Sequence, residues 1–94
     1  MSPRARQFFD PQFITEGEAN ELWHRCMQQI ETAHKKGYAP GIFKVRGVLV
    51  QVSLVLNANG HLVRFWLRQM VSNALILVGN RQGLLPLDVE PIHG

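Results

Sequence analysis

The stretch VLVQVSLVLNANGHLVRFWLRQM, residues 48–70, has apolar residues at every even position from 48 to 56 and every odd position from 63 to 67. Between the two runs, Asn59-Gly60 is a strong signal for a two-residue hairpin turn, because both residue types tolerate a positive φ angle. Pairing Ala58 with His61 places one set of apolar side chains on a single face: Val48, Val50, Val52, Leu54, Leu56, Val63, Phe65 and Leu67. A shift of one residue would scramble this face. The stretch therefore predicts an antiparallel hairpin with one buried face.

The segment before it, TEGEANELWHRCMQQIETAHKKG (15–37), predicts an amphipathic helix. Thr15 and Glu18 have the spacing of a capping box, and Gly37 is a helix stop. The apolar residues follow the helical period: Ala19, Leu22, Trp23, Cys26, Met27, Ile30 and Ala33. This helix needs an apolar surface to cover, and the inner face of the hairpin supplies one.

The remaining segments extend the sheet or lie beside it. In GIFKVRG the apolar residues change parity at Gly47, which predicts a β-bulge. Residues 73–80 predict a third strand, and residues 84–90 a fourth that Pro86 would confine to an edge. Residues 1–14 read as an N-terminal arm, and we expect its second half to dock on the body through phenylalanines: Phe8, Phe9 and Phe13.

These elements predict an α+β fold, with one N-terminal amphipathic helix packed across a three- to four-stranded antiparallel β-meander. Residues 15–94 would form one domain behind the arm, as expected for a chain of 94 residues. In architecture alone, this arrangement resembles the cystatin-like folds. Such a likeness carries no function.

Composition narrows the class of protein. A single cysteine, Cys26, excludes an intramolecular disulfide framework and a multi-cysteine zinc site. The N-terminus lacks the apolar core of a signal peptide, and no run approaches the roughly 20 apolar residues of a membrane helix. We therefore expect a cytoplasmic protein that needs no membrane, cofactor or metal.

The net charge of +3 hides a strong asymmetry along the chain. Residues 10–31 contain five acids against one base, whereas residues 32–87 contain no acid and seven bases: Lys35, Lys36, Lys44, Arg46, Arg64, Arg68 and Arg81. A positive half attracts an anionic partner, either nucleic acid or an acidic protein. The same bases could equally keep a β-rich half soluble and protect its edges.

The second face of the hairpin is the candidate site. In the predicted register, Arg64, Trp66 and Arg68 share this face with Leu49 and Met70. A turn at Ser72-Asn73 would add Leu75 and Leu77 beside Met70 and Arg68, and would place Gly79 next to the Trp66 ring. An apolar patch of this kind on a small domain indicates an interaction surface.

Two interpretations of this surface stay open. The aliphatic side chains favour burial by a second copy, giving a homodimer, or by the arm or the C-terminal segment folding back. Alternatively, Trp66 between two arginines forms a platform on which single-stranded nucleic acid stacks, with anion-binding help from Lys44, Arg46 and Arg81. A stacking surface normally offers more than one aromatic ring. We therefore expect a self-associating, non-enzymatic binding module.

Catalytic patterns are weak. Glu21 with His24, and Glu31 with His34, have the Glu-x-x-His spacing of di-iron bundles, but both pairs lie on a single helix. Cys26 lies in the apolar stripe, where a buried and inert thiol is expected. A small basic ribonuclease of the toxin type is the remaining enzymatic alternative, using phosphate-binding and acid–base groups from one set: Arg46, His61, Arg64, Arg68 and Arg81.

Overall fold

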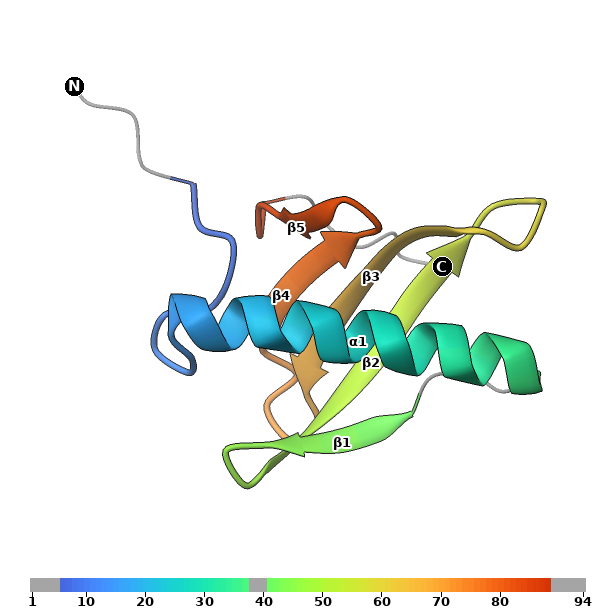
Figure 1. Cartoon of the computed structure of the whole chain (residues 1–94). Helices are drawn as coiled ribbons and strands as arrows, with labels where there is room; N and C mark the ends of the chain where they lie inside the picture. Colours follow the sequence, from blue (N-terminus) through green and yellow to red (C-terminus); the bar gives the residue numbers. More distant parts are fainter. Residues whose placement is uncertain (1–5, 38–40, 89–94) are drawn as a thin grey trace.

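The computed structural model describes residues 6–37 and 41–88 and has an α+β fold (Figure 1). One helix, α1 (Glu16–Lys36), precedes five strands that pair antiparallel in chain order. The strands are β1 (Ile42–Val45), β2 (Val48–Leu56), β3 (Leu62–Gln69), β4 (Leu75–Asn80) and β5 (Gly83–Leu85). The predicted architecture is confirmed, with five strands in place of three or four.

Both ends of α1 are formed by the residues that the sequence indicated. The Thr15 hydroxyl accepts a hydrogen bond from the Glu18 N–H at 3.2 Å, and the Glu18 carboxylate accepts one from the Thr15 N–H at 2.9 Å. Gly37 ends the helix in the left-handed conformation, with a φ of 76°. This capping box and glycine stop satisfy backbone groups that the helix itself leaves unpaired.

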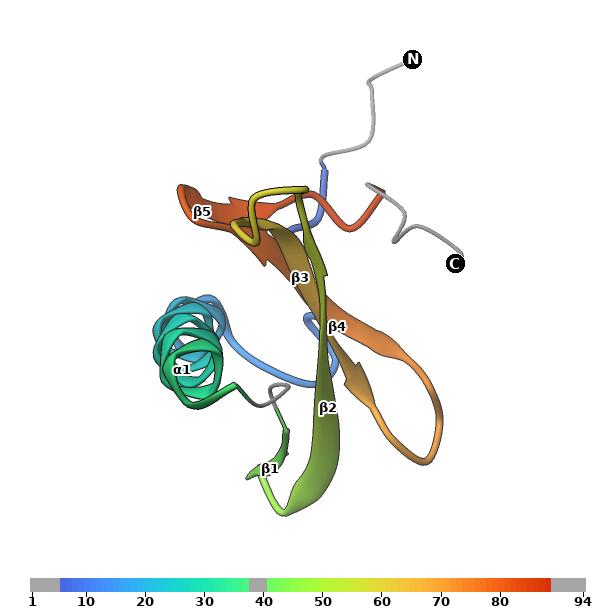
Figure 2. The ribbon, with the colours of Figure 1, turned by 90° about the vertical axis from the view of Figure 1, so that its right-hand side faces the viewer.

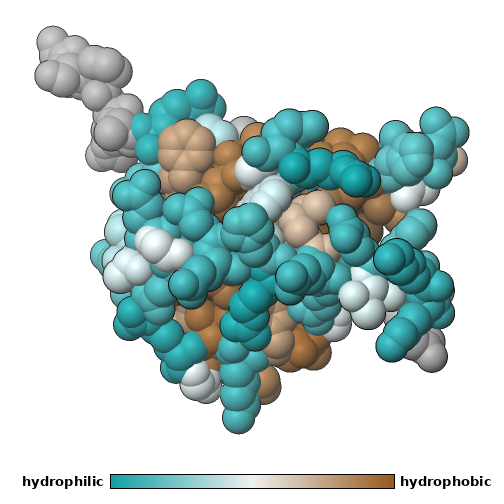
Figure 3. All heavy atoms as spheres, in the orientation of Figure 1, coloured by the Kyte–Doolittle hydropathy of each residue, from teal (hydrophilic) through white to brown (hydrophobic). Residues whose placement is uncertain are grey.

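The helix lies across one face of a curved sheet. Seen edge-on, the strands at both sides of the sheet, β1 and β5, bend toward α1 (Figure 2). The outward surface on the helix side is mostly hydrophilic (Figure 3). We call the face of the sheet that contacts α1 the inner face and the opposite one the outer face.

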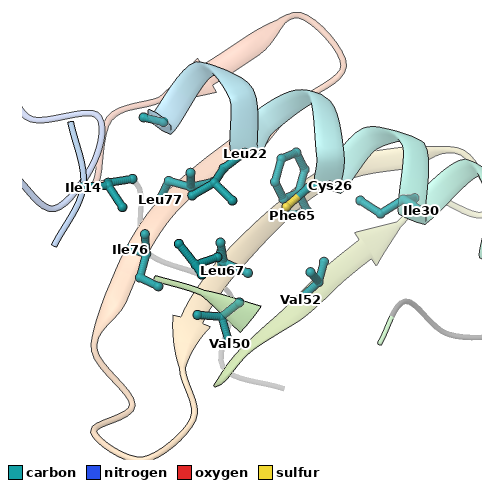
Figure 4. Close-up of a cluster of buried hydrophobic side chains, with 12 residues drawn as sticks. Ile14, Leu22, Cys26, Ile30, Val50, Val52, Phe65, Leu67, Ile76 and Leu77 are labelled. Carbon is teal, nitrogen blue, oxygen red and sulfur yellow. The ribbon is translucent and has the colours of Figure 1, made fainter. Parts of the chain in front are cut away.

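The core fills the space between α1 and the inner face. Leu22, Cys26 and Ile30 point from the helix toward side chains of β2, β3 and β4 (Figure 4). Phe65 and Leu67 of β3 are fully buried there. The helical and the strand periodicities therefore meet in one apolar cluster, as the sequence predicted.

The predicted register of the β2–β3 hairpin is confirmed over its centre, where Val52 pairs with Leu67 and Leu54 with Phe65. The predicted length of the turn is wrong by one residue. Gly60, with a φ of 78°, donates its N–H to the Asn57 carbonyl at 2.9 Å, and the Asn57 N–H bonds to the His61 carbonyl at 2.8 Å. The loop thus contains one residue more than a two-residue turn.

This longer loop changes which side chains face the helix at the end of the hairpin. The register shifts next to Leu56, which pairs with Leu62 rather than with Val63. Leu62 packs against the core, whereas Leu56 and Val63 each keep 42% of their surface exposed. The expected Leu56–Val63 contact in the core is therefore wrong, because a bulge turns Val63 outward.

Gly47 belongs to a hairpin turn and not to a bulge within one strand. Val45 pairs with Val48, and the two residues between them, Arg46 and Gly47, have φ angles of 51° and 76°. Two successive positive φ angles are the mark of a type I′ turn, which joins tightly paired strands. The change of parity at this point is the reversal of the chain from β1 to β2.

The second half of the arm docks on the sheet, as expected. Phe9 forms a bridge with Leu77, and the Asp10 N–H donates to the Ile76 carbonyl at 2.8 Å. Phe9 and Phe13 are half-buried against the core, whereas Phe8 is 40% exposed. At the other end, β5 stops immediately before Pro86 at an edge of the sheet, and residues 89–90 of the predicted last strand lie outside the described residues.

Candidate interaction surface

The outer face of β2 and β3 carries the pairs that the register predicted. Trp66 lies opposite Ser53, and Arg68 lies opposite Gln51. Because side chains alternate along a strand, these residues point away from the fully buried neighbours Phe65 and Leu67. Arg64, Trp66 and Arg68 thus share the outer face, and each is half-buried.

Exposed aliphatic side chains gather at one end of this face. Leu49 and Met70 lie side by side, joined by a backbone hydrogen bond of 3.0 Å, and expose 45% and 41% of their surface. Val71 is 96% exposed in the β3–β4 loop, which projects away from α1 (Figure 2). Ile42, which pairs with Gln51 and is 51% exposed, lies on the same face. We call these four residues the aliphatic patch.

Sequence reasoning found Leu49 and Met70 but missed two members of the patch. Ile42 was missed because a bulge at Gly47 would have placed β1 and β2 in one strand. The Arg46-Gly47 pair between two apolar runs was the available signal for a turn. Val71 was missed because it comes directly before the predicted turn at Ser72-Asn73. An aliphatic side chain beside a polar turn was the available signal of an exposed apolar residue.

Leu75 lies on the outer face as predicted, whereas Leu77 does not. Leu75 pairs with Arg68 and is half-buried. The register then shifts by one residue, so that Leu77 pairs with Leu67 and is fully buried in the core (Figure 4). The predicted place of Leu77 is therefore wrong, because a bulge in β4 moves it to the inner face.

The same bulge changes the role of Gly79. This glycine pairs with Phe65 on the inner face and not with Trp66. A Cβ atom there would lie 2.8 Å from Phe65 Cζ and 2.9 Å from Trp23 Cδ1. The missing side chain makes room for the rings of Phe65 and Trp23. The prediction that Gly79 lies next to the ring of Trp66 is therefore wrong.

On the β4 side of Trp66, the outer face is covered. Val78 lies opposite Trp66 and is fully buried, although it does not belong to the core cluster under α1. The chain after β5 crosses to this side of the sheet (Figure 2), where the Leu87 N–H donates to the Gln7 carbonyl at 2.7 Å. The uncovered part of the outer face is therefore the end formed by β1, β2 and the β3–β4 loop.

The two arginines beside Trp66 are partly engaged within the chain. Arg68 Nη1 donates to the Asn73 carbonyl at 3.1 Å and so ties β3 to its loop. Arg64 also has an interaction partner. The five strands contain no Asp or Glu, so on this face the strands themselves offer only cations and neutral hydrogen-bonding groups.

The three anion-binding candidates do not come together. Arg46 forms an ion pair with Glu18, with Nε 2.8 Å from Oε2. This guanidinium, together with the capping-box hydrogen bonds of Thr15, lowers the pKa of Glu18 from 4.5 to about 2. Lys44 lines a shallow depression beside Glu18 and Glu21. Arg81 lies in the β4–β5 turn and lines a separate pocket with His34 and His61. Arg46 is thus occupied by an acid of the chain itself.

The structure also separates the residues of the ribonuclease alternative. Arg64 and Arg68 lie on the outer face, the side chain of Arg46 pairs with Glu18 at the start of α1, and His61 lies beside Arg81 on the helix side. His34 joins this last pair and was not among the candidates. Its position four residues after Ile30 and seven after Met27 was the signal that it continues the helical stripe.

Neither a metal centre nor a reactive thiol is present in the described part of the chain. Within residues 6–37 and 41–88, no group of three or more His, Cys, Asp and Glu side chains could hold a metal ion. Burial raises the pKa of the Cys26 thiol to about 12, so the nucleophilic thiolate is strongly disfavoured. No helix in these ranges is long and apolar enough to cross a membrane.

No family model, curated protein or solved structure matches this chain. The function proposed below therefore rests on the geometry of the molecule.

Proposed function

We propose that this protein is a non-enzymatic binding module that forms a homodimer through the uncovered end of its outer face. The observation that carries the proposal is the aliphatic patch, whose members expose between 41% and 96% of their surface. Exposed apolar side chains that gather at one end of a small domain are a feature of interaction sites. Burial in a second copy would remove them from water.

A second copy is a suitable partner because its own aliphatic patch would pack against this one. A two-fold interface brings the same patch from both subunits together, so aliphatic side chains pack on aliphatic side chains. Gln51 and Ser53 lie on the same face, and their neutral side-chain oxygens can accept hydrogen bonds from the second copy. No carboxylate of a strand has to be buried.

Charged substitution within the patch tests this proposal. Met70→Lys places an ammonium group in the centre of the proposed interface, and we expect the dissociation constant of the dimer to rise by at least about tenfold, equivalent to about 1.4 kcal/mol. Leu56→Lys is the matched control, because Leu56 is 42% exposed but lies at the other end of β2 and outside the patch. Sedimentation velocity over a range of micromolar concentrations measures both variants.

The proposal fails if Met70→Lys and the parent chain sediment alike, or if both substitutions weaken association equally. Circular dichroism on both variants separates loss of association from loss of fold.

Single-stranded nucleic acid is the second candidate partner, favoured by Arg64 and Arg68 on either side of Trp66 and by strands without acids. Trp66→Ala separates the two candidates. Loss of binding to an oligonucleotide by a folded monomer supports the stacking platform. Loss of the dimer, without any oligonucleotide binding by the parent chain, supports self-association.

A further inference from the structure

A small pocket lies on the helix side of the molecule, away from the proposed dimer interface. It is formed by the second half of α1 and by the two turns at the same end of the sheet, between β2 and β3 and between β4 and β5. Its polar lining consists of Glu31, His34, His61 and Arg81, and its volume is about 90 Å³. Three segments far apart in the sequence thus bring four chemically active side chains together.

The nitrogen groups of this pocket are available to a ligand. Among residues 6–37 and 41–88, no hydrogen bond or ion pair engages the side chains of His34, His61 or Arg81. Gly60 also lines the pocket, and a Cβ atom there would lie 3.9 Å from His34 Cε1. The four polar side chains are exposed and the rest of the lining is apolar, so the pocket is open to a ligand from solvent.

The types of donor indicate an oxyanion. A guanidinium presents a planar fork of N–H groups that matches the oxygens of phosphate, and imidazoles add further N–H donors. Whole small-molecule ligands need pockets of roughly 300–1,000 Å³, so only one group of such a ligand enters.

The single carboxylate narrows the choice of oxyanion. Glu31 would repel a fully deprotonated anion, but it can accept a hydrogen bond from an anion that keeps a proton. Phosphate monoesters lose their second proton only near pH 6, and inorganic phosphate still keeps most of its second proton at that pH, whereas sulfate carries none. Glu31 therefore favours phosphate over sulfate.

We propose that this pocket binds a phosphate group, with Arg81 and the two histidines as donors and Glu31 as the acceptor for the phosphate proton. The group comes either from inorganic phosphate or from a phosphorylated small molecule whose remainder stays outside. The proposal is independent of the dimer interface, since none of these four residues lies on the outer face.

Imidazole NMR signals provide the direct test. The full chain is titrated with sodium phosphate and, separately, with sodium sulfate at equal ionic strength near pH 6, where histidine is sensitive to its charge environment. We expect saturable shifts of His34 and His61 with phosphate and little change with sulfate. His24, which is exposed on α1 and packs edge-on against Trp23, is the internal control.

Two substitutions within the pocket and one control substitution extend the test. Arg81→Gln removes the fork and should weaken phosphate binding by at least about tenfold, as expected for charge-assisted hydrogen bonds. Lys44→Gln, a matched loss of one exposed positive charge on β1, should leave it unchanged. Glu31→Gln should reduce the preference for phosphate over sulfate. Backbone amide spectra establish that each variant is folded.

The outcomes are distinct. Equal shifts with both anions at all three histidines, or shifts that do not saturate, would overturn the proposal, as would unchanged binding in Arg81→Gln. A titration with methyl phosphate distinguishes the sources. Tighter binding than inorganic phosphate assigns the pocket to a phosphorylated molecule, and weaker binding assigns it to the free ion.

Discussion

Gly79 lies in β4 directly opposite Phe65, where two aromatic rings occupy the space of a side chain. Trp23 reaches this place from α1 and donates its Nε1–H to the Asn80 carbonyl at 2.8 Å. One residue without a Cβ atom therefore allows the helix to be fixed to β4 by both packing and a hydrogen bond. Any side chain at position 79 must displace the ring of Phe65 or that of Trp23.

Gly79→Ala should destabilise the protein by about 1–3 kcal/mol, the usual cost of overpacking a core. Urea unfolding followed by tryptophan fluorescence measures the difference. Gly17→Ala is the control, because position 17 lies in the first turn of α1, where a Cβ atom would have only Thr15 Oγ1 at 4.0 Å. That change should be neutral or stabilising, by up to about 1 kcal/mol. Equal stability of Gly79→Ala and the parent chain would contradict the described packing.

At the scale of elements, Arg46 joins the β1–β2 turn to the beginning of α1. Its guanidinium pairs with the same Glu18 carboxylate that closes the capping box. One acid therefore serves both the helix end and the contact between helix and hairpin. The positive φ of Arg46 places a residue at a turn position that glycine or asparagine usually fills, and the ion pair is a reason to keep arginine there.

The ion pair predicts a pH-dependent stability. The pKa of Glu18 is lowered to about 2 in the folded chain from 4.5, so its contribution is complete above pH 4.5 and is lost as the pH falls toward 2. Glu18→Gln keeps an acceptor for the capping box but removes the charge. The parent chain should melt at a higher temperature than this variant at pH 7, and the difference should shrink below pH 4.5 and be lost as the pH falls through about 2.

Glu21→Gln is the control for this experiment, since Glu21 forms no ion pair with any residue in the described ranges. Thermal melting by circular dichroism at several pH values compares the three chains. A difference between parent and Glu18→Gln that persists unchanged at pH 2 would contradict the assigned role of the ion pair.

The helix and the strands were easier to predict than the register in which the strands pair. The helix and its caps, and the central register of the hairpin, follow from local patterns: Thr15 with Glu18, Gly37, and the alternation around Phe65. A bulge changes the parity of the apolar residues, but this change cannot be seen in β4, whose residues are apolar on both faces. The bulge in β4 alone moved Leu77 from the candidate site into the core.

The pocket of His34, His61 and Arg81 was hidden for a different reason. Its members come from α1 and two separate turns, and only the angle at which the helix crosses the sheet brings them together (Figure 1). No spacing along the chain encodes that angle. In contrast, Leu49 and Met70 could be placed on the outer face from the hairpin register alone.

In the molecule as a whole, one face of the sheet is buried in the core and the other is only partly covered. α1 buries the inner face, while the arm and the chain after β5 account for the side of the outer face near Val78. The end with Ile42, Leu49, Met70 and Val71 stays uncovered. This unequal covering is the basis for proposing that the molecule functions through a second copy of itself.

The absolute mass in solution, measured by light scattering behind a sizing column at micromolar concentration, tests this central claim most directly. We predict a mass near twice the 10.7 kDa of one chain, because the aliphatic patch is then buried between two copies. A mass near 10.7 kDa across the accessible concentration range would contradict self-association and would leave the outer face to a different partner.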